Sequence, residues 1–249
     1  MQFRRKIGIE LEFGQSCYTD YPDAPQEWYL ARDSSVYGTG PNGTGFEYKF
    51  KKPTDGDEVI HNVNVICDFF SRHDDIKSGP DQNAGYHLHL NYHGMSENVG
   101  FRFYKLAKSL YPYISKMVHE SRVSGRQSSW TKYDGTNLAR YYITLKKRMD
   151  REPYYKCVDY PFSRMIACSS RNWVDLGAMQ RRGSIEIRLH EGTLDRNKIL
   201  TWAEFWSELS LWSDANYKIA ACRESAKRIF EELNLSDKTR ERVLSTVNV

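Results

Sequence analysis

The chain has 249 residues, enough to bury a hydrophobic core in one domain, or at most two small ones. Its 36 Lys and Arg against 32 Asp and Glu give a formal net charge of +4, which is too small to indicate a dedicated nucleic-acid partner. The longest apolar runs fall far short of the roughly 20 residues that a membrane span requires. We therefore expect a soluble globular protein with neither a membrane nor a dedicated nucleic-acid partner.

The N-terminus and the cysteines indicate the compartment. The opening MQFRRKIGIELEF contains no apolar stretch and no small-residue cleavage site, so we expect no secretion signal. The five cysteines are odd in number, widely scattered and never arranged as Cys-x-x-Cys. They are Cys17, Cys67, Cys157, Cys168 and Cys222. This pattern is typical of reduced thiols and predicts a cytoplasmic protein.

The first half of the chain alternates predicted strands with turns. Residues 6–13, 46–50 and 85–90 alternate apolar and polar side chains, as strands with one buried face do. A connecting helix is expected over 57–72. From Ser96 onward the apolar residues recur at helical spacing, which predicts an amphipathic helix.

The second half begins with a polar, basic, Ser/Gly-rich segment at 121–135, which predicts a mobile loop before a helix near 137–149. Two strands joined by a turn are then expected as a hairpin: 173–179, the turn 180–183, and 184–190. The chain is predicted to be helical from about residue 195. No repeat or long linker interrupts it, so we expect residues 1–249 to form a single domain.

Four predicted strands share one design, in which apolar residues take one face and ionisable residues take the other. The second face carries Glu10, Glu12, Glu47, Lys49, His87, His89, Glu186, Arg188 and His190. Taken one at a time, these strands resemble ordinary solvent-facing strands of an antiparallel sheet. Solvent faces normally use Thr, Ser and Lys freely, however, so four strands rich in Glu and His together indicate a functional surface.

At least four carboxylates and two or three imidazoles would meet on this surface. Carboxylates that close repel one another and raise one another's pKa unless a cation neutralises them. Oxygen-rich ligand sets suit Mg²⁺, or Mn²⁺ where an imidazole takes part. His87 and His89 with one Glu would also suit a catalytic zinc ion, which leaves a zinc hydrolase open. Arg188 lies two residues from Glu186, a pairing that suits phosphate held jointly by metal and arginine.

These motifs resemble the amidoligases of the glutamine synthetase-like carboxylate-amine ligase superfamily, which includes the glutamate-cysteine ligases. The likeness spans roughly residues 7–206 and depends on four stretches in order: GIELEF at 8–13, Asp33-Ser34-Ser35 with Gly45-Phe46-Glu47, GYHLHL at 85–90, and SIEIRLHEGTLD at 184–195. The resemblance implies an α+β fold. In it, a curved antiparallel sheet binds ATP and two or more Mg²⁺ ions on its concave face, and helices pack on its convex face.

The resemblance also implies roles for individual residues. The expected metal ligands are Glu10, Glu12, Glu47, His87 and Glu186. His89 is expected close to the substrate or the phosphates, and Arg188 on the transferred phosphate. Asp33, in a motif that lacks the family's usual intervening glycine, is our candidate for the base that deprotonates the amine. In the basic loop, Arg122 and Arg126 are expected either to clamp phosphate or an acidic substrate, or to lie in solvent.

The implied reaction is activation of a carboxylate by phosphoryl transfer from ATP, followed by displacement of phosphate by an amine. The product is an amide or isopeptide bond. The sequence leaves open whether the substrates are amino acids, peptides, protein side chains or polyamines, and whether the protein is an oligomer. Two alternatives remain: a zinc- or manganese-dependent hydrolase that uses the same Glu/His face, and a non-catalytic binding protein of this fold.

Overall fold

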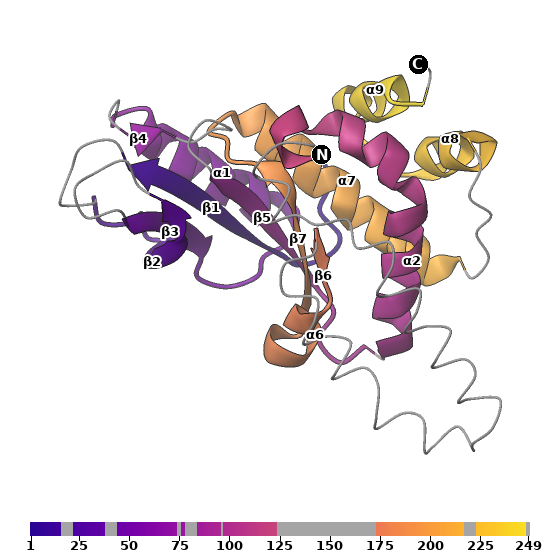
Figure 1. Ribbon diagram of the computed structural model, residues 1–249, viewed down its shortest axis with the longest axis horizontal. Helices are drawn as coiled ribbons and strands as arrows, with labels where there is room; N and C mark the ends of the chain where they lie inside the picture. Colours follow the sequence, from indigo (N-terminus) through magenta and orange to yellow (C-terminus); the bar gives the residue numbers. More distant parts are fainter. Residues whose placement is uncertain are drawn as a thin grey trace.

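The computed structural model describes residues 1–15, 22–37, 44–73, 76–77, 84–95, 97–123, 173–216 and 223–247 (Figure 1). Its strands are β1 (Ile7–Gln15), β2 (Trp28–Tyr37), β3 (Thr44–Phe50), β4 (Ile76–Lys77), β5 (Gly85–Asn91), β6 (Val174–Asp175) and β7 (Ser184–Glu191). Its α-helices are α1 (Gly56–Phe70), α2 (Glu97–Ile114), α6 (Gly177–Arg182), α7 (Arg196–Ala215), α8 (Arg223–Glu232) and α9 (Asp237–Ser245). Two short 3₁₀ helices are η2 (Ser115–Met117) and η3 (Glu120–Arg122).

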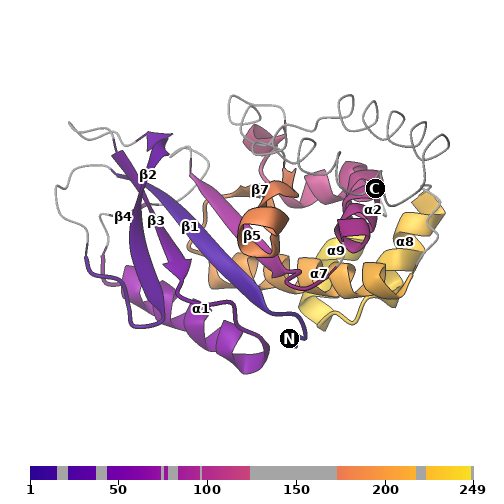
Figure 2. The ribbon, with the colours of Figure 1, turned by 90° about the horizontal axis from the view of Figure 1, so that it is seen from below.

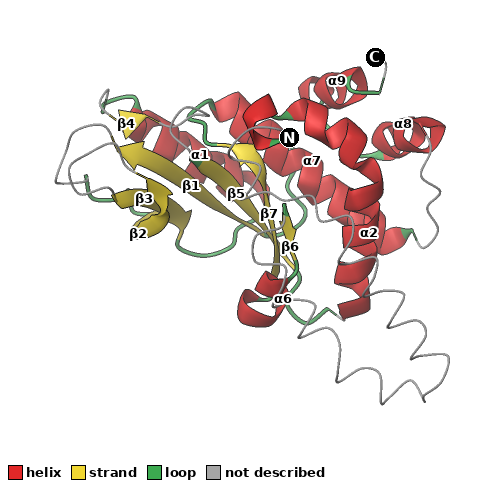
Figure 3. Ribbon diagram, in the orientation of Figure 1, coloured by secondary structure: helices red, strands yellow, loops and turns green. Residues whose placement is uncertain are grey.

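The strands form one antiparallel sheet in the order β2-β3-β1-β5-β7-β6, and β4 pairs with the end of β1. Strands adjacent in space come from distant parts of the sequence, since β1 lies between β3 and β5, and β5 pairs with β7. The expected α+β class and antiparallel sheet are confirmed (Figure 3). The four strands predicted to carry ionisable residues are therefore neighbours.

Helices cover the apolar face of the sheet. Figure 2 shows α1 and α7 side by side along the strands, and α2, α8 and α9 lie beyond α7. The core joins aliphatic strand residues such as Ile9, Leu88 and Ile187 to the aromatic residues Trp202 and Trp206 of α7. Each of these five side chains is at most 2% exposed. The predicted packing of the helical tail against the sheet is confirmed.

The predicted hairpin at 173–190 is wrong in its first half. Only Val174–Asp175 are extended, and the chain then forms α6, which ends at Gly183 in the left-handed conformation with φ 66°. The reason is that GAMQRR consists mostly of helix-compatible residues, and the glycine after it supplies a favourable helix C-cap. β6 still pairs antiparallel with β7.

Other differences concern segments without a clear alternating pattern. The strand β2 was not predicted, because the polar residues of its second half interrupt the alternation, and its register with β3 shifts after Asp33. The predicted loop at 121–135 begins later than expected, since Glu120–Arg122 form η3. Its remainder from residue 124, and the helix expected near 137–149, lie outside the described residues. No helix in the described part of the chain has the length and apolarity needed to cross a membrane.

Candidate functional site

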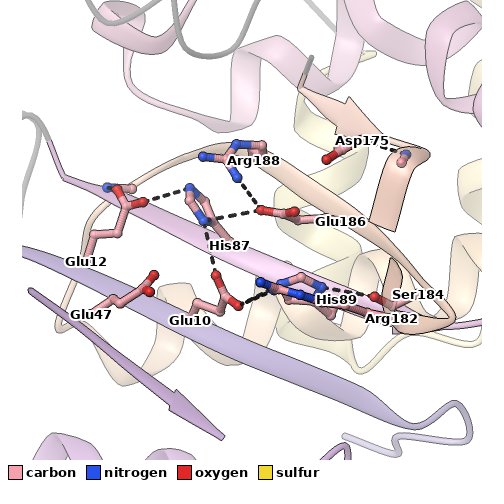
Figure 4. A network of polar contacts seen from close by, with 12 residues as sticks. Glu10, Glu12, Glu47, His87, His89, Asp175, Arg182, Ser184, Glu186 and Arg188 are labelled. Atoms are coloured by element: carbon pink, nitrogen blue, oxygen red, sulfur yellow. Dashed lines mark hydrogen bonds and ion pairs between the residues drawn. The ribbon is translucent and has the colours of Figure 1, made fainter. Parts of the chain in front are cut away.

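The polar face of the sheet gathers the ionisable side chains that the alternation predicts (Figure 4). The register places Glu10 opposite both His87 and Lys49, and His89 opposite Glu186. Glu12 and Glu47 also face each other across β1 and β3. The charged residues of this face are nevertheless buried: Glu10, Glu12, Glu47, His87, His89 and Glu186 are each at most 8% exposed.

His87 lies at the centre and contacts three carboxylates. Its Nδ1 atom lies 3.5 Å from Oε2 of Glu10 and 3.4 Å from Oε1 of Glu186, and its Nε2 atom lies 3.2 Å from Oε1 of Glu12. Nδ1 is buried, and neither of its contacts has hydrogen-bond geometry. A buried nitrogen between two carboxylates without an aligned hydrogen bond is available as a ligand to a cation.

His89 extends the cluster toward the opposite end of β5. Its Nε2 atom lies 3.0 Å from Oε1 of Glu10, and its Nδ1 atom lies 3.1 Å from the hydroxyl oxygen of Ser184. Ser184 thereby fixes the orientation of the imidazole ring. His89 therefore links Glu10 to the first residue of β7.

Three cations neutralise the carboxylates. Lys49 lies 3.3 Å from Glu10 and 2.5 Å from Glu47, Arg182 lies 3.1 Å from Glu10, and Arg188 forms an ion pair with Glu186. Sequence reasoning had placed Lys49 on this face without a role, and it missed Arg182 because that residue was assigned to a turn. Arg182 reaches the site because α6 ends directly before β7.

The pKa values reflect this pairing. Burial alone would raise the pKa of Glu10, but His87 and His89 outweigh it and hold the pKa well below its ordinary value. Burial likewise opposes ionisation of Glu186, and Arg188 and the two histidines overcome it, so that its pKa is lowered as well. Both carboxylates are therefore ionised and suited to hold a cation.

The cluster contains a compact set of metal-ligand atoms. Glu10, His87 and Glu186 each offer one atom, and these atoms lie within 4.8 Å of one another. Two carboxylates and one imidazole are a donor set that suits Mg²⁺ or Mn²⁺. Glu12 and Glu47, the other two expected ligands, lie on the same face, and Glu12 also accepts a hydrogen bond of 2.6 Å from the backbone nitrogen of Gly85.

A β-bulge positions Arg188 and removes His190 from the polar face. Leu88 of β5 pairs with Ile187 of β7, and Tyr86 pairs with His190. One residue of β5 therefore lies opposite two residues of β7 between these pairs, which is a bulge in β7. Bulges of this kind redirect side chains. The expectation that His190 shares the polar face is wrong: its ring packs 5.5 Å from Tyr86 and 5.0 Å from Trp202, on the helix side.

Arg122 is a buried anchor and not part of a solvated loop. It is 3% exposed, and its guanidinium donates to the backbone carbonyl of Arg188 at 2.7 Å. Burial lowers its pKa to about 10. A methyl group built on Gly85 would lie 3.1 Å from its Nη2 atom and 2.9 Å from Oε2 of Glu12, so Arg122 also borders the cluster.

Two predicted site residues are not tested. The backbone of Asp33 lies in β2 opposite Gly45, on the strand beside β3, but its side chain is outside the described part of the structure. Arg126 lies outside the described residues altogether. Their expected roles stay predictions.

Comparison with known proteins identifies the family of the chain. No curated protein matches the chain. The family described as "Putative amidoligase enzyme" matches residues 72–210, which is more than half of the chain and includes β5, β7 and most of α7. The match therefore contains His87, His89, Glu186 and Arg188, the residues that β5 and β7 contribute to the polar face. The chain belongs to the amidoligase family, whose description indicates a ligase-type enzyme.

Proposed function

We propose that this protein is an ATP-dependent carboxylate-amine ligase that forms an amide or isopeptide bond through an acyl phosphate. The observation that carries the proposal is the set of Glu10, His87 and Glu186 around one point, with Arg188 beside it, on a buried polar sheet face. An antiparallel sheet with helices on its apolar face also supports a glutamine synthetase-like fold. The proposed enzyme is a single catalytic domain of residues 1–249 and is cytoplasmic, in keeping with its scattered, odd cysteines.

The described side chains fit Mg²⁺, with Mn²⁺ as the alternative. Ligand atoms bound to one Mg²⁺ at about 2.1 Å lie within about 4.2 Å of one another. The three atoms of Glu10, His87 and Glu186 lie within 4.8 Å, so small side-chain rotations bring them into range. Glu12 and Glu47 would complete the shell or hold a second ion. The bound ions would offset charge on the phosphates and polarise the γ-phosphoryl group.

The chain's own residues then supply orientation and electrostatic stabilisation. The guanidinium of Arg188 lies at the edge of the cluster, held by Glu186, where it would donate to the equatorial oxygens of the transferring phosphoryl group. His89, oriented by Ser184, would contact the substrate or the phosphates. Buried surroundings strengthen both interactions because they exclude water.

The two chemical steps balance without an oxidant or reductant. In the first, a carboxylate oxygen attacks the γ-phosphorus of ATP and ADP leaves. In the second, a neutral amine attacks the acyl carbon and inorganic phosphate leaves, while the amine proton passes to a base. We propose Asp33 for this base, since β2 carries it beside the strand of Glu47. The remaining candidate substrates are those of the sequence analysis.

Calorimetric titration of ATP tests the proposal first. We expect binding in the presence of Mg²⁺, none in EDTA, and none in Glu186→Gln, a variant that keeps the shape of the side chain and removes its charge. Glu191→Gln is the matched control: it lies on the same strand and is 4% exposed like Glu186, but its carboxylate accepts from the backbone of His119 outside the cluster.

The chemistry is then tested by ADP release with candidate acids and amines, and by hydroxylamine, which traps an acyl phosphate as a hydroxamate. Glu186→Gln and Arg188→Ala should each abolish ADP formation while the circular dichroism spectrum stays native. Wild-type protein that binds no ATP with either metal, or a folded Glu186→Gln/Arg188→Ala double variant that still releases ADP, would overturn the ligase proposal.

A further inference from the structure

A pocket lies on the polar face beside the cluster, and its lining extends beyond the residues assigned above. Its volume is about 340 Å³, within the range of small-molecule sites. The residues that line it are Gly8, Ile9, Glu10, Tyr29, Lys49, Phe50, Pro53, His89, Asn91, Arg182 and Ser184. It therefore opens at the Glu10 and His89 end of the cluster, and its lining includes neither Arg188 nor Glu12.

Gly8 is the reason that this space exists. It pairs with His89 and precedes Glu10 by two residues on β1, so a side chain there would project from the polar face. A Cβ atom built on Gly8 would meet only Cβ of His89, at 3.4 Å, which is ordinary contact. The backbone thus tolerates a larger residue, and the missing side chain leaves the pocket open.

The pocket has one cationic wall and one apolar wall. Lys49 and Arg182 contribute the positive charge. Tyr29, Phe50 and Pro53 form the apolar part, and Tyr29 is 42% exposed, a high value for so large a ring. Such a combination suits a small molecule that has one anionic group and an apolar or aromatic body.

His89 adds a polar atom aimed at the same space. The residue is 8% exposed, lines the pocket, and its Nε2 atom has no hydrogen bond of good geometry. Both cations presently pair with Glu10, the carboxylate that the proposed metal ion would share. Lys49 also pairs with Glu47, the second proposed metal ligand beside it, so metal binding at both carboxylates would release Lys49 and Arg182 to pair with an anion. Anion binding would then be coupled to metal binding.

We propose that this pocket binds the acid substrate of the ligase, a small carboxylic acid with an apolar or aromatic body whose carboxylate is held by Lys49 and Arg182. This inference rests on the proposed function. In phosphoryl transfer the attacking and leaving oxygens lie roughly in line on opposite sides of the phosphorus. In Figure 4, Arg188 and Glu10 lie on opposite sides of His87, and Glu10 lines the pocket, so the acid would attack the phosphorus from the Glu10 side and ADP would leave on the side away from the pocket.

Saturation-transfer NMR in a buffer that contains Mg²⁺ and no Mn²⁺ tests the pocket directly. It measures the binding of phenylacetate and of its neutral amide, phenylacetamide. We expect phenylacetate to bind about tenfold more tightly than the amide, because a charge-assisted pair with Lys49 and Arg182 is available only to the acid. EDTA should weaken binding of the acid. Equal binding of the two probes, or no binding of phenylacetate, would overturn the proposal.

The variants separate the pocket from the rest of the face. Gly8→Val should narrow the pocket beside His89 and reduce phenylacetate binding about tenfold, and Lys49→Met and Arg182→Gln should remove the preference for the acid. Arg181→Gln is the matched control for Arg182: it is the preceding residue of α6, but its guanidinium pairs with Asp175 and does not line the pocket. Lys52→Met, an exposed lysine near β3, controls for Lys49. Unchanged binding in Gly8→Val would place the probe elsewhere and contradict the proposal.

Titration of ATP into the same variants distinguishes the possible failures. We expect Gly8→Val to bind Mg-ATP as wild type does. If Gly8→Val loses ATP instead, the pocket holds the nucleotide and the acid assignment is wrong, while the ligase proposal stands. If wild type binds phenylacetate but no ATP, the ligase proposal fails although the anion pocket exists.

Discussion

The two faces of the central sheet are buried to a similar extent but by opposite means. On the helix side, Ile9 and Leu88 pack against aromatic residues of α7 and are at most 1% exposed. On the other side, Glu10 and His87 are at most 7% exposed, yet they are surrounded by charged partners. Apolar burial stabilises the fold directly, whereas the pairing of buried charges does little more than offset their desolvation. The comparison therefore assigns stability to one face and chemistry to the other.

The largest expected effect comes from truncating the apolar side. Trp206 on α7 is fully buried, and its ring lies 5.8 Å from Phe103, 6.0 Å from Trp173 and 5.6 Å from Trp202. We expect Trp206→Ala to lower the free energy of unfolding by about 3–5 kcal/mol, because it removes the packing and leaves a cavity. Urea denaturation measures the loss. A loss below about 1 kcal/mol would mean that α7 does not anchor the sheet as described.

His190 is an ionisable group on the apolar side, brought there by the bulge in β7, and it makes stability depend on pH. Burial lowers its pKa to about 4, so the folded protein resists its protonation. Between pH 6.5 and pH 4 the unfolded chain protonates His190 more readily than the folded protein does. The contribution of neutral His190 to the stability of the fold is therefore complete above the ordinary pKa near 6.5 and is lost as the pH falls toward 4. We expect about 2 kcal/mol less stability at pH 5 than at pH 7.5.

The substitution His190→Phe should flatten this dependence, as measured by denaturant unfolding at both pH values. The charged neighbours Glu191, Arg242 and Lys198 also act on His190. The pKa of Glu191 is itself lowered, so that its contribution is lost only below its ordinary pKa of 4.5 and lies outside the chosen window. A variant with the same pH slope as wild type would show that another group is responsible.

On the polar side, a methyl group should disturb binding more than stability. In Gly85→Ala, the new Cβ would lie 2.9 Å from both Oε2 of Glu12 and Nε2 of His87, which forces these side-chain ends to move. We expect Mn²⁺ affinity, measured by calorimetry, to fall about tenfold, equivalent to about 1.4 kcal/mol, with a smaller change in unfolding free energy. Gly8→Ala is the control, since its Cβ meets only an ordinary contact. Equal metal affinity in both variants would exclude Glu12 and His87 from the metal site.

The same two faces show which site residues can be predicted from the sequence and which cannot. Glu10, Glu12 and His87 were predictable because a strand alternates its side chains locally, and the pairing of β1 with β5 follows the same alternation. Arg182 and His190 were not, because the first depends on where α6 ends and the second on one extra residue in β7. The burial of Arg122 could not be predicted either, because it depends on a tertiary contact with the backbone of β7. The polar, Ser/Gly-rich sequence around Arg122 contains no local pattern that indicates this contact.

The smallest effect that we expect concerns the helix layer. Asp195 caps α7, and its carboxylate accepts from the backbone nitrogens of Asn197 at 2.8 Å and Lys198 at 3.3 Å. Asp195→Ala should cost about 1 kcal/mol in thermal or urea unfolding, and Asp195→Asn should retain most of the stability, because Asn caps nearly as well. Since α7 supports the sheet only from the apolar side, neither variant should alter Mn²⁺ affinity. A cap variant that stays folded but loses metal would show that the two faces are not independent, and that α7 also sets the positions of the carboxylates.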